Sequence, residues 1–280
     1  DKILGFQGHA SVYSADLNPL QNYQDIAARL EKIPGVVRVT PLVEGQAMAS
    51  SLRNNTGALV RGISEADIEK LPSIVNDNLR TALKEEGVPD DPPSFKGFDA
   101  SEGVAIGERM AWRHQLGLGS TLTIISPEGP ETIVGNAPRI RDYPVVAIFK
   151  VGMSDYDENV IYMPLVEAQD YFVTEEGVNQ IEVTVENPDD IEALILPLRE
   201  ASGEGMAVQT WKQRNLTFFN ALAVERNVMF LVLTMIILVA ALNIISGLIM
   251  LVKDKGRDIA ILRTMGATRG AIQRVFFITG

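Results

Sequence analysis

Histidine and cysteine, which most often bind metals or act as bases and nucleophiles, are nearly missing from this chain. The only histidines are His9 and His114, and there is no cysteine. A zinc site needs several Cys or His ligands at defined spacing, and disulfide or thiolate chemistry needs cysteine. We therefore expect no metal site and no catalytic thiol.

Two other patterns could carry chemistry. The stretch Gly117-Leu118-Gly119-Ser120-Thr121 is similar to a phosphate-binding loop, but it lacks the Walker spacing and lysine, and it fits a helix C-terminal turn leading into a strand. The pairs Asp90-Asp91 and Asp189-Asp190 could form a general acid and base. Both lie beside prolines, where solvated turns and helix N-caps are typical. We expect no catalytic site in this chain.

One segment predicts where the chain resides. The 25 residues from Val228 to Val252 carry no formal charge, and a helix of about 20 apolar residues spans a bilayer. From Val228 to Gly280 there are six Lys and Arg against two Asp and Glu, whereas the preceding residues carry 19 against 34. By the positive-inside rule, the tail is cytoplasmic and residues 1 to about 227 lie outside. The acidic excess argues against nucleic acid as a partner.

The exported part alternates helices and strands. Apolar residues from Tyr23 to Ile33 recur at helical spacing, and Pro34-Gly35 stops that helix before the β-branched strand 36–40. A strand at 57–63 leads into Ser64, which resembles the first residue of a capping box. Further strands are expected at 103–106, 121–125, 145–151, 160–163, 180–185 and 207–210, with helices at 108–116, 164–172 and from 187. This alternation predicts α+β or α/β layers.

Two segments read as loops and one as a long helix. The tract Glu85 to Asp99 has three prolines and two glycines, and the tract Ser126 to Pro144 has four and two, which predicts a joint and a long hairpin loop. From Trp211 to Val252 the pattern is helical without a breaker. A new apolar run begins at Ala271, so we expect this chain to be a fragment with a further span beyond it.

The stretch Lys253 to Arg274 predicts a short amphipathic helix lying flat at the inner face of the membrane. Its apolar stripe consists of Ile259, Leu262, Met265, Ile272 and Val275, and its basic side of Lys255, Arg257, Arg263 and Arg269. An interfacial anchor and a docking helix for a cytoplasmic partner both fit this pattern.

The same region resembles a known family. Residues Asn243–Lys255 and Arg257–Thr268 are similar to the second membrane helix and coupling helix of FtsX/MacB-like ABC permeases, most closely the lipoprotein-releasing LolC/LolE type. The resemblance extends over essentially all 280 residues. In the exported part it rests on Gly35-Val36-Val37, Pro41–Glu44, Val60–Ile63, Gly107-Glu108 and Leu116–Ser120.

This resemblance implies a fragment of a four-helix permease with a two-lobed α+β periplasmic domain. It implies the following parts: the first part of a Porter-like lobe at 1–62, a Sabre-like middle lobe at 63–149 with the hairpin loop 126–144, the second part of the Porter-like lobe at 150–215, an extended helix at 216–252 that includes the span 228–252, a cytoplasmic coupling helix at 253–270, and the start of the next membrane helix at 271–280.

The resemblance also implies a function and partners. Two permease subunits, identical or paralogous, would sit on a cytoplasmic ABC ATPase dimer, extract triacylated lipoproteins from the outer leaflet of the bacterial inner membrane and pass them to a periplasmic carrier. The chain itself would be non-catalytic and hold no cofactor, because ATP and Mg²⁺ bind to the ATPase. The Val252–Lys255 tail favours the E type and the proline-rich hairpin the C type.

Three sets of site residues follow from the resemblance. Contacts to the ATPase would come from Arg257, Asp258, Ile261, Leu262, Arg263 and Met265. The hairpin lies where LolC-type subunits carry the carrier-binding Hook, so Ile133, Val134, Pro138, Arg139, Ile140 and Arg141 would bind the carrier, although an ordinary variable loop also fits. An acyl-chain cavity would be lined by Phe218, Phe219, Leu222, Met229, Phe230 and Leu233, a stripe that could equally face lipid or a neighbouring helix.

Other functions remain open from the sequence. A MacB-like efflux permease or an FtsX-like permease that transmits motion to a periplasmic partner belongs to the same superfamily. The former usually carries its own ATPase domain upstream, and the latter has a much smaller outer domain. A membrane-tethered periplasmic enzyme would need a catalytic constellation, and the sequence presents none.

Overall fold

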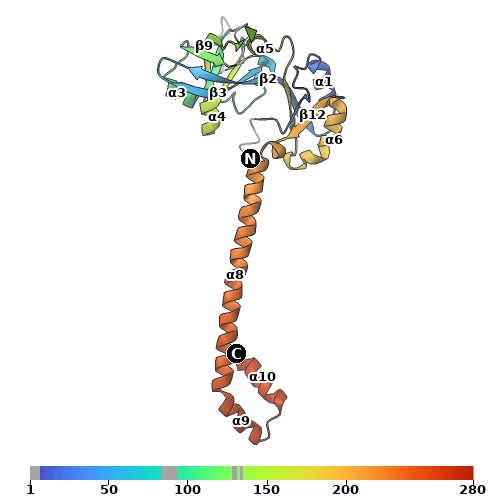
Figure 1. Cartoon of the computed structure of the whole chain (residues 1–280), viewed down its shortest axis with the longest axis vertical. Coiled ribbons are helices and arrows are strands. Elements are labelled where there is room, and N and C mark those ends of the chain that lie inside the picture. The colour runs from blue at the N-terminus through green and yellow to red at the C-terminus, as the bar shows by residue number, and fades with distance from the viewer. Residues whose placement is uncertain (1–6, 84–93, 128–130, 133–134, 280) are drawn as a thin grey trace. The chain divides into compact units, whose positions relative to one another are not determined.

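A computed structural model of the chain describes residues 7–83, 94–127, 131–132 and 135–279 (Figure 1). The chain forms two compact units, Asp1–Arg214 and Asn215–Gly280. The first unit carries the sheet and the second is helical. Each unit is described by itself below.

The strands and helices of the first unit alternate along the chain. Its strands are β1 (Ala10–Ser14), β2 (Val36–Ser50), β3 (Asn55–Ile63), β4 (Arg80–Thr81), β5 (Val104–Gly107), β6 (Thr121–Ser126), β7 (Glu131–Thr132), β8 (Gly135–Asn136), β9 (Arg139–Phe149), β10 (Val160–Pro164), β11 (Gln180–Val185) and β12 (Met206–Thr210). Its helices are α1 (Tyr23–Leu30), α2 (Glu65–Ile68), α3 (Glu108–His114), α4 (Ser154–Asn159), α5 (Leu165–Phe172), the 3-10 turn η2 (Pro188–Asp190), α6 (Ile191–Ser202) and α7 (Trp211–Arg214). The predicted mixed α+β class is therefore confirmed.

Ten of the described strands form one sheet in the order β12-β1-β11-β2-β3-β10-β5-β9-β4, with β6 pairing to both β2 and β9. Pairing is antiparallel except between β3 and β10 and between β5 and β9. The long strand β2, with 15 residues, pairs with β11 at its start and with β3 and β6 further on. One continuous sheet therefore runs through the unit, and the predicted division into two lobes stays a prediction.

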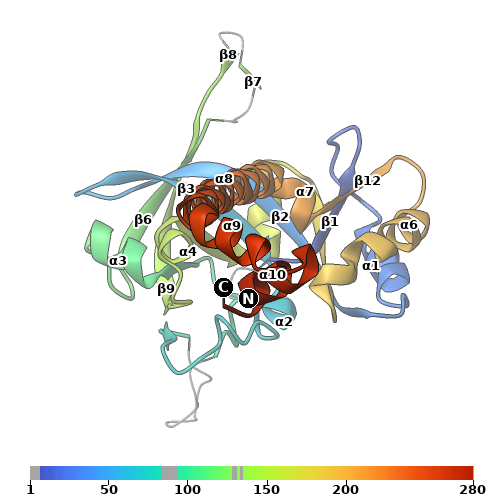
Figure 2. The ribbon, with the colours of Figure 1, turned by 90° about the horizontal axis from the view of Figure 1, so that it is seen from below.

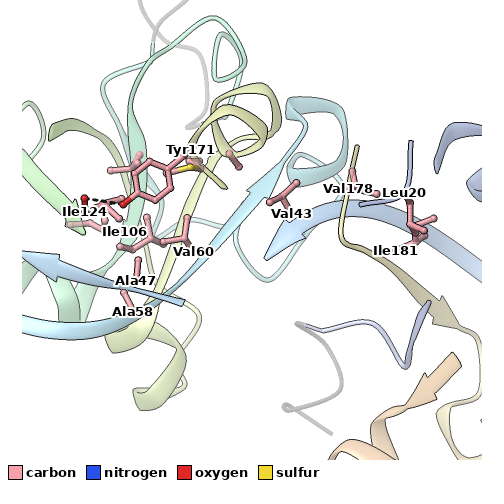
Figure 3. Close-up of a cluster of buried hydrophobic side chains, with 14 of the residues drawn as sticks. Leu20, Val43, Ala47, Ala58, Val60, Ile106, Ile124, Tyr171, Val178 and Ile181 are labelled. Atoms are coloured by element: carbon pink, nitrogen blue, oxygen red, sulfur yellow. Dashed lines mark hydrogen bonds between the residues drawn. The ribbon is translucent and has the colours of Figure 1, made fainter. Parts of the chain in front are cut away.

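Two hydrophobic clusters pack against this sheet. The larger one combines α1 and α6 with β1, β11 and β2, and continues to β6, β9 and α5. In it the Tyr171 hydroxyl donates to the carbonyl of Ile124 at 3.0 Å (Figure 3). The smaller cluster gathers around Phe95, Phe98, Phe149 and Tyr162, all fully buried. Phe149 and Tyr162 come from β9 and β10, whereas Phe95 and Phe98 precede β5 in the chain.

Several local signals in the sequence form the predicted structures. Helix α1 ends before Pro34, Gly35 takes the left-handed conformation at φ 90°, and β2 begins at Val36. Ser64 caps α2 by accepting a hydrogen bond from the Asp67 backbone N–H at 3.3 Å. The predicted helix start at Ser64 and the predicted helix-to-strand turn are therefore confirmed.

Two predictions need correction. The strand predicted from Val145 begins at Arg139 as β9, because Thr121–Ser126 pairs with Pro144–Arg139 in an antiparallel hairpin, and the short pair β7–β8 follows further out (Figure 2). The helix predicted without a break from Trp211 is interrupted at Asn215, where α7 ends and the next helix starts. Most of the predicted loop 85–99 lies outside the described residues.

The second unit is built from three helices: α8 (Leu216–Asp254), α9 (Gly256–Thr264) and α10 (Arg269–Thr279). Residues Asn220–Asp254 of α8 are long and apolar enough to cross a membrane, and the most apolar 18-residue window within them has a mean hydropathy of 2.9. Gly266 at φ 96° separates α9 from α10. The predicted coupling segment 253–270 thus consists of the end of α8, the helix α9, the connection 265–268 and the first two residues of α10.

Candidate functional site

The residues predicted to contact an ATPase lie on α9 or directly after it, and four of them share one face of the helix. Asp258, Ile261, Leu262 and Met265 follow the spacing that aligns side chains along one face of a helix. Ile261, Leu262 and Met265 are exposed by 55%, 45% and 80%. Exposed apolar side chains grouped in this way are typical of interaction surfaces, and the contact of these residues with an ATPase stays a prediction.

Charged residues flank this apolar face. Arg257 lies at one edge of this face, whereas Arg263 lies about 100° beyond Leu262, toward the opposite side of the helix, and both are exposed. Asp258 forms an ion pair with Lys255 at 3.3 Å. Ile259, which the sequence placed in the apolar stripe, is half-buried, so Ile261 takes its place on the exposed face. An apolar surface with a basic edge at Arg257 suits a partner groove that has an acidic rim.

The residues predicted to line an acyl-chain cavity lie on α8. Leu222, Met229 and Leu233 fall within about 40° of one another around the helix, and Phe230 lies beside them. All four are exposed, Phe230 by 72%. Phe218 and Phe219 lie in α8, but their side chains are outside the described residues. The four described residues therefore share one broad apolar side, and their role as a cavity lining stays a prediction.

The two arginines predicted to bind a carrier form contacts with α5 of the same chain. Arg139 donates to the carbonyl of Tyr171 at 2.9 Å. Arg141 forms ion pairs with Glu167 at 3.1 Å and Asp170 at 2.6 Å. These contacts fasten the loop end of the paired strands β6 and β9 to α5. Both guanidinium groups are therefore already bound within the fold, which limits their use in binding a carrier.

Of the four other hairpin residues predicted to bind a carrier, two are described by the structure and both are exposed. Ile140 is 59% exposed and Pro138 is exposed as well. Ile140 faces Ile125 of β6, which in turn faces Met48 of β2, so the three residues form an apolar row across three strands. Ile133 and Val134 lie outside the described residues. The carrier-binding role of this hairpin stays a prediction.

The histidine that could act as a base is buried and serves the fold. His114 is 1% exposed, and its ring nitrogens lie 2.8 Å from Thr56 Oγ1 and 3.0 Å from Ser51 Oγ. Burial and the charge of Arg113 lower the pKa of His114 below its usual value of 6.5. Ser51 Oγ also accepts from the Asn54 backbone N–H at 3.2 Å. His114 thus fastens the β2–β3 turn to α3.

The other patterns that could carry chemistry are used within turns. Gly117 N–H donates to Ser120 Oγ at 3.0 Å, and Gly119 N–H donates to the carbonyl of Val145 at 2.8 Å, so these amides do not form a phosphate cradle. Asp189 and Asp190 lie in η2. Asp90-Asp91 lies outside the described residues. Among the residues that are described, no group of three or more His, Asp and Glu side chains could hold a metal ion.

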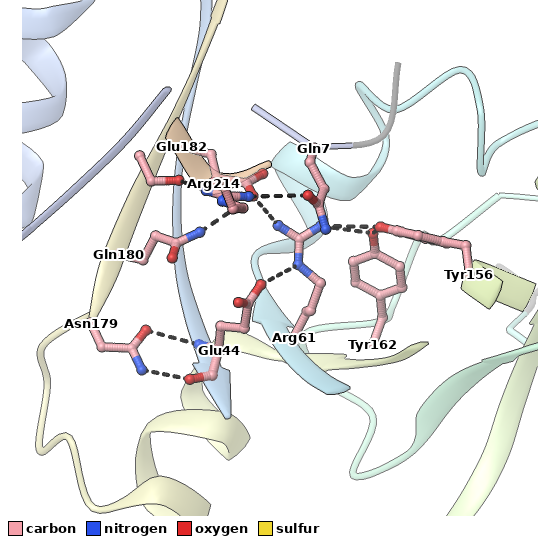
Figure 4. Close-up of polar contacts among 10 residues, drawn as sticks. Gln7, Glu44, Arg61, Tyr156, Tyr162, Asn179, Gln180, Glu182 and Arg214 are labelled. Carbon is pink, nitrogen blue, oxygen red and sulfur yellow. Dashed lines mark hydrogen bonds and ion pairs between the residues drawn. The ribbon is translucent and has the colours of Figure 1, made fainter. Parts of the chain in front are cut away.

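A charged cluster that the sequence did not predict lies in the centre of the sheet (Figure 4). Arg61 on β3 is 2% exposed and forms ion pairs with Glu44 at 3.2 Å and Glu182 at 2.5 Å. It also donates to the hydroxyls of Tyr156 at 3.1 Å and Tyr162 at 3.3 Å. We call Ser11, Glu182, Glu44, Arg61 and Tyr162 the polar ladder. These residues come from five neighbouring strands, β1, β11, β2, β3 and β10.

Burial and charge oppose each other within this cluster. Burial raises the pKa of Glu44 above 4.5, while the charges of Arg61 and Arg214 lower it. Burial also raises the pKa of Tyr156, whose hydroxyl contacts that of Tyr162. Both tyrosines therefore stay neutral and Arg61 stays charged. Arg61 lies among the apolar residues Leu59, Val60 and Ile63, so a charge within an apolar strand was the signal in the sequence.

Comparison with curated proteins gives relatives over the whole chain. It is 28% identical over 280 residues to the lipoprotein-releasing system transmembrane protein LolC of Neisseria meningitidis and 26% identical over 281 residues to LolC of Xylella fastidiosa. It is 27% identical over 286 residues to LolE of Haemophilus influenzae. The resemblance to LolC/LolE-type proteins predicted from the sequence is therefore confirmed. The chain spans 64–65% of the length of these relatives.

Comparison with solved structures gives more distant similarities. The periplasmic region of MacB from Actinobacillus actinomycetemcomitans matches 79% of this chain and 99% of its own, with a TM-score of 0.46 and 15% identity. The extracellular domain of the ABC-type transporter YknZ from Gram-positive bacteria matches 71% of this chain and 98% of its own, with a TM-score of 0.38 and 16% identity. No family model matches the chain.

Proposed function

We propose that this chain is part of a permease subunit of an ABC transporter that extracts lipoproteins from the inner membrane. The observation that carries the proposal is its relationship over the whole chain to LolC and LolE proteins, joined to a membrane-length helix followed by the exposed amphipathic helix α9. In this proposal the first unit lies in the periplasm, and α9 lies at the cytoplasmic face.

The proposal assigns the energy source to partners. A cytoplasmic ABC ATPase dimer binds ATP and Mg²⁺, and this chain contributes no catalytic group. The apolar face of α9, which includes Leu262, docks on the ATPase, and Arg257 at its edge and Arg263 further around the helix pair with acidic residues there. A second permease subunit, identical or paralogous, completes the transporter. A triacylated lipoprotein is the substrate and a periplasmic protein is the acceptor.

The proposal assigns the substrate and the carrier to two sets of exposed residues. The apolar side of α8 around Leu222 and Phe230 would face the acyl chains. For the carrier, Ile140 and Pro138 are the described hairpin residues available for contact, because Arg139 and Arg141 already bind α5. Strand pairing with β7 or β8 would be the mode of addition.

Co-purification tests the ATPase assignment. In the full-length permease, Leu262→Asp places a charge on the apolar face and should abolish co-purification of the ATPase. Ala260→Ser is the matched control, because Ala260 lies on the opposite side of α9 and is also exposed. Retention of the ATPase by the Leu262→Asp protein would contradict the assignment of α9.

A further inference from the structure

The polar ladder ends beside the residue that precedes the membrane helix. α8 starts at Leu216, two residues after Arg214, and Arg214 hydrogen-bonds to Ser11 of the ladder. We propose that Arg214 and the polar ladder form one coupled element that carries a displacement at the start of α8 across five strands to Tyr156 on α4. Its consequence for transport rests on the proposed function, whereas the coupling itself does not.

The first part of the argument is how α7 is held. Arg214 Nη1 donates to Gln7 Oε1 at 3.0 Å, and Arg214 Nη2 donates to Ser11 Oγ. The backbone N–H of Trp211 donates to the carbonyl of His9 at 2.9 Å. All three contacts join α7 to the segment that forms β1. A pull on α7 therefore acts first on β1.

The second part is the register of the ladder. Ser11 faces Glu182 across β1 and β11. Glu44 faces Arg61 across β2 and β3, and Arg61 faces Tyr162 across β3 and β10. These are two rows of directly opposed residues. The Arg61–Glu182 ion pair, at 2.5 Å, joins the two rows into one path.

The third part is the position of this path between the two hydrophobic clusters. Glu182 lies between Ile181 and Val183 of the larger cluster, whereas Tyr156 and Tyr162 belong to the smaller one. Arg61 therefore bonds to both sides at once. Any shift of β11 relative to β3 must either break an ion pair in a low-dielectric interior or carry α4 along, and the second costs less.

The fourth part is that stability alone does not account for the ladder. Buried ion pairs give little net stability relative to apolar side chains of similar volume, because desolvation offsets the attraction. The side chains of Arg61 and Glu182 are 2% and 8% exposed. A directional network at this point instead makes the positions of its members depend on one another.

A double-mutant cycle on the 280-residue chain in detergent tests the coupling. Arg214→Gln and Tyr156→Phe remove opposite ends of the path, and we expect the change in the unfolding constant of the double variant to differ from the product of the single changes by about threefold or more. Ser11→Ala with Tyr156→Phe gives a second cycle should Arg214→Gln fail to fold. Multiplicative effects in both cycles would overturn the proposal.

Lys212→Gln supplies the matched control. Lys212 is also a cation on α7, but its Nζ donates to the carbonyl of Asp189 at 3.0 Å and pairs with Glu192 at 3.5 Å, both outside the ladder. We expect its effect to multiply with that of Tyr156→Phe. If Lys212→Gln and Arg214→Gln deviated equally from multiplicative behaviour with Tyr156→Phe, the coupling would not be specific to the polar ladder, and the proposal would be overturned.

The consequence for transport has a separate readout. In the reconstituted full-length transporter, Arg214→Gln should lower the lipoprotein released per ATP hydrolysed severalfold while ATP hydrolysis continues, and Lys212→Gln should not. An unchanged yield for Arg214→Gln would overturn the role in transport. Absence of release by the wild-type transporter would refute the proposed function instead, and the double-mutant cycle would still decide whether the ladder is coupled.

Discussion

Replacing Arg61 by methionine should be strongly destabilising, and the loss should arise from the carboxylates left behind. Arg61→Met keeps a long apolar side chain in the same space but leaves Glu182, with an 8% exposed side chain, without its ion pair. Removing one partner of a buried pair costs about 3–5 kcal/mol. The side chain of Glu44 is 26% exposed and can still be hydrated, so it adds less. We expect a loss of about 3–4 kcal/mol in the free energy of unfolding.

A charge-neutral triple variant separates electrostatics from packing. Arg61→Met combined with Glu44→Gln and Glu182→Gln removes every formal charge of the ladder while keeping similar volumes. Because replacing a whole buried ion network is often nearly neutral, the triple variant should recover most of the lost stability. Methionine in the single variant and in the triple variant fills the same space, so packing is matched between them.

Tryptophan fluorescence during denaturant unfolding of the 280-residue chain in detergent gives the measurement. Both tryptophans of the chain, Trp112 and Trp211, lie in the unit Asp1–Arg214, so the signal reports that unit. A loss below about 1 kcal/mol for Arg61→Met would refute the reasoning, since it would fall in the range of exposed pairs. A triple variant as unstable as the single one would show that packing, not unpaired charge, dominates.

Three further predictions concern stability and pH. Burial raises the folded pKa of Glu44, so its favourable contribution exists below pH 4.5 and is lost as pH rises through the folded value. The unfolding free energy of the wild type relative to Glu44→Gln should therefore fall as pH rises above 4.5, and a flat difference would contradict this. His114 has a lowered pKa, so its contribution to the free energy of unfolding exists above pH 6.5 and is lost as pH falls through the folded value. In denaturant titrations at acid pH, the wild type should therefore lose stability relative to His114→Asn. A gain in stability of the wild type relative to this variant would contradict the prediction. Gly62→Ala places a Cβ 2.0 Å from Ala168 Cβ and should lower the free energy of unfolding by about 1–3 kcal/mol. Gly57→Ala is the control, because a Cβ at Gly57 meets no atom within 4 Å and should be tolerated. Equal thermal stability of the two variants would contradict this packing.

Local signals in the sequence were sufficient for most elements. Helix α1 and its stop at Pro34-Gly35, the cap at Ser64 and the apolar span in α8 each depend on residues within a few positions of one another. The start of β9 at Arg139 was missed because proline and glycine in the preceding tract predict a loop. Pairing with β6 overrides that local preference.

The polar ladder could not be predicted, because its residues meet only through sheet order and register. Glu182 reaches Arg61 because β11 lies beside β2, a pairing that joins strands more than a hundred residues apart. The same holds for Arg141, which the hairpin pattern left exposed and which α5 binds through Glu167. Both contacts depend on which segments lie side by side in the fold, and local propensity carries no information about that arrangement.

Release of a triacylated lipoprotein from proteoliposomes tests the proposed function most directly. The vesicles would hold the full-length permease, its ABC ATPase and any paired permease, with ATP and soluble carrier added. The account predicts ATP-dependent transfer to the carrier that disappears when Leu262 and Arg263 are both replaced by alanine and persists with Ala260→Ser. A complex that hydrolyses ATP but transfers no lipoprotein would contradict the account and favour efflux or control of a periplasmic partner.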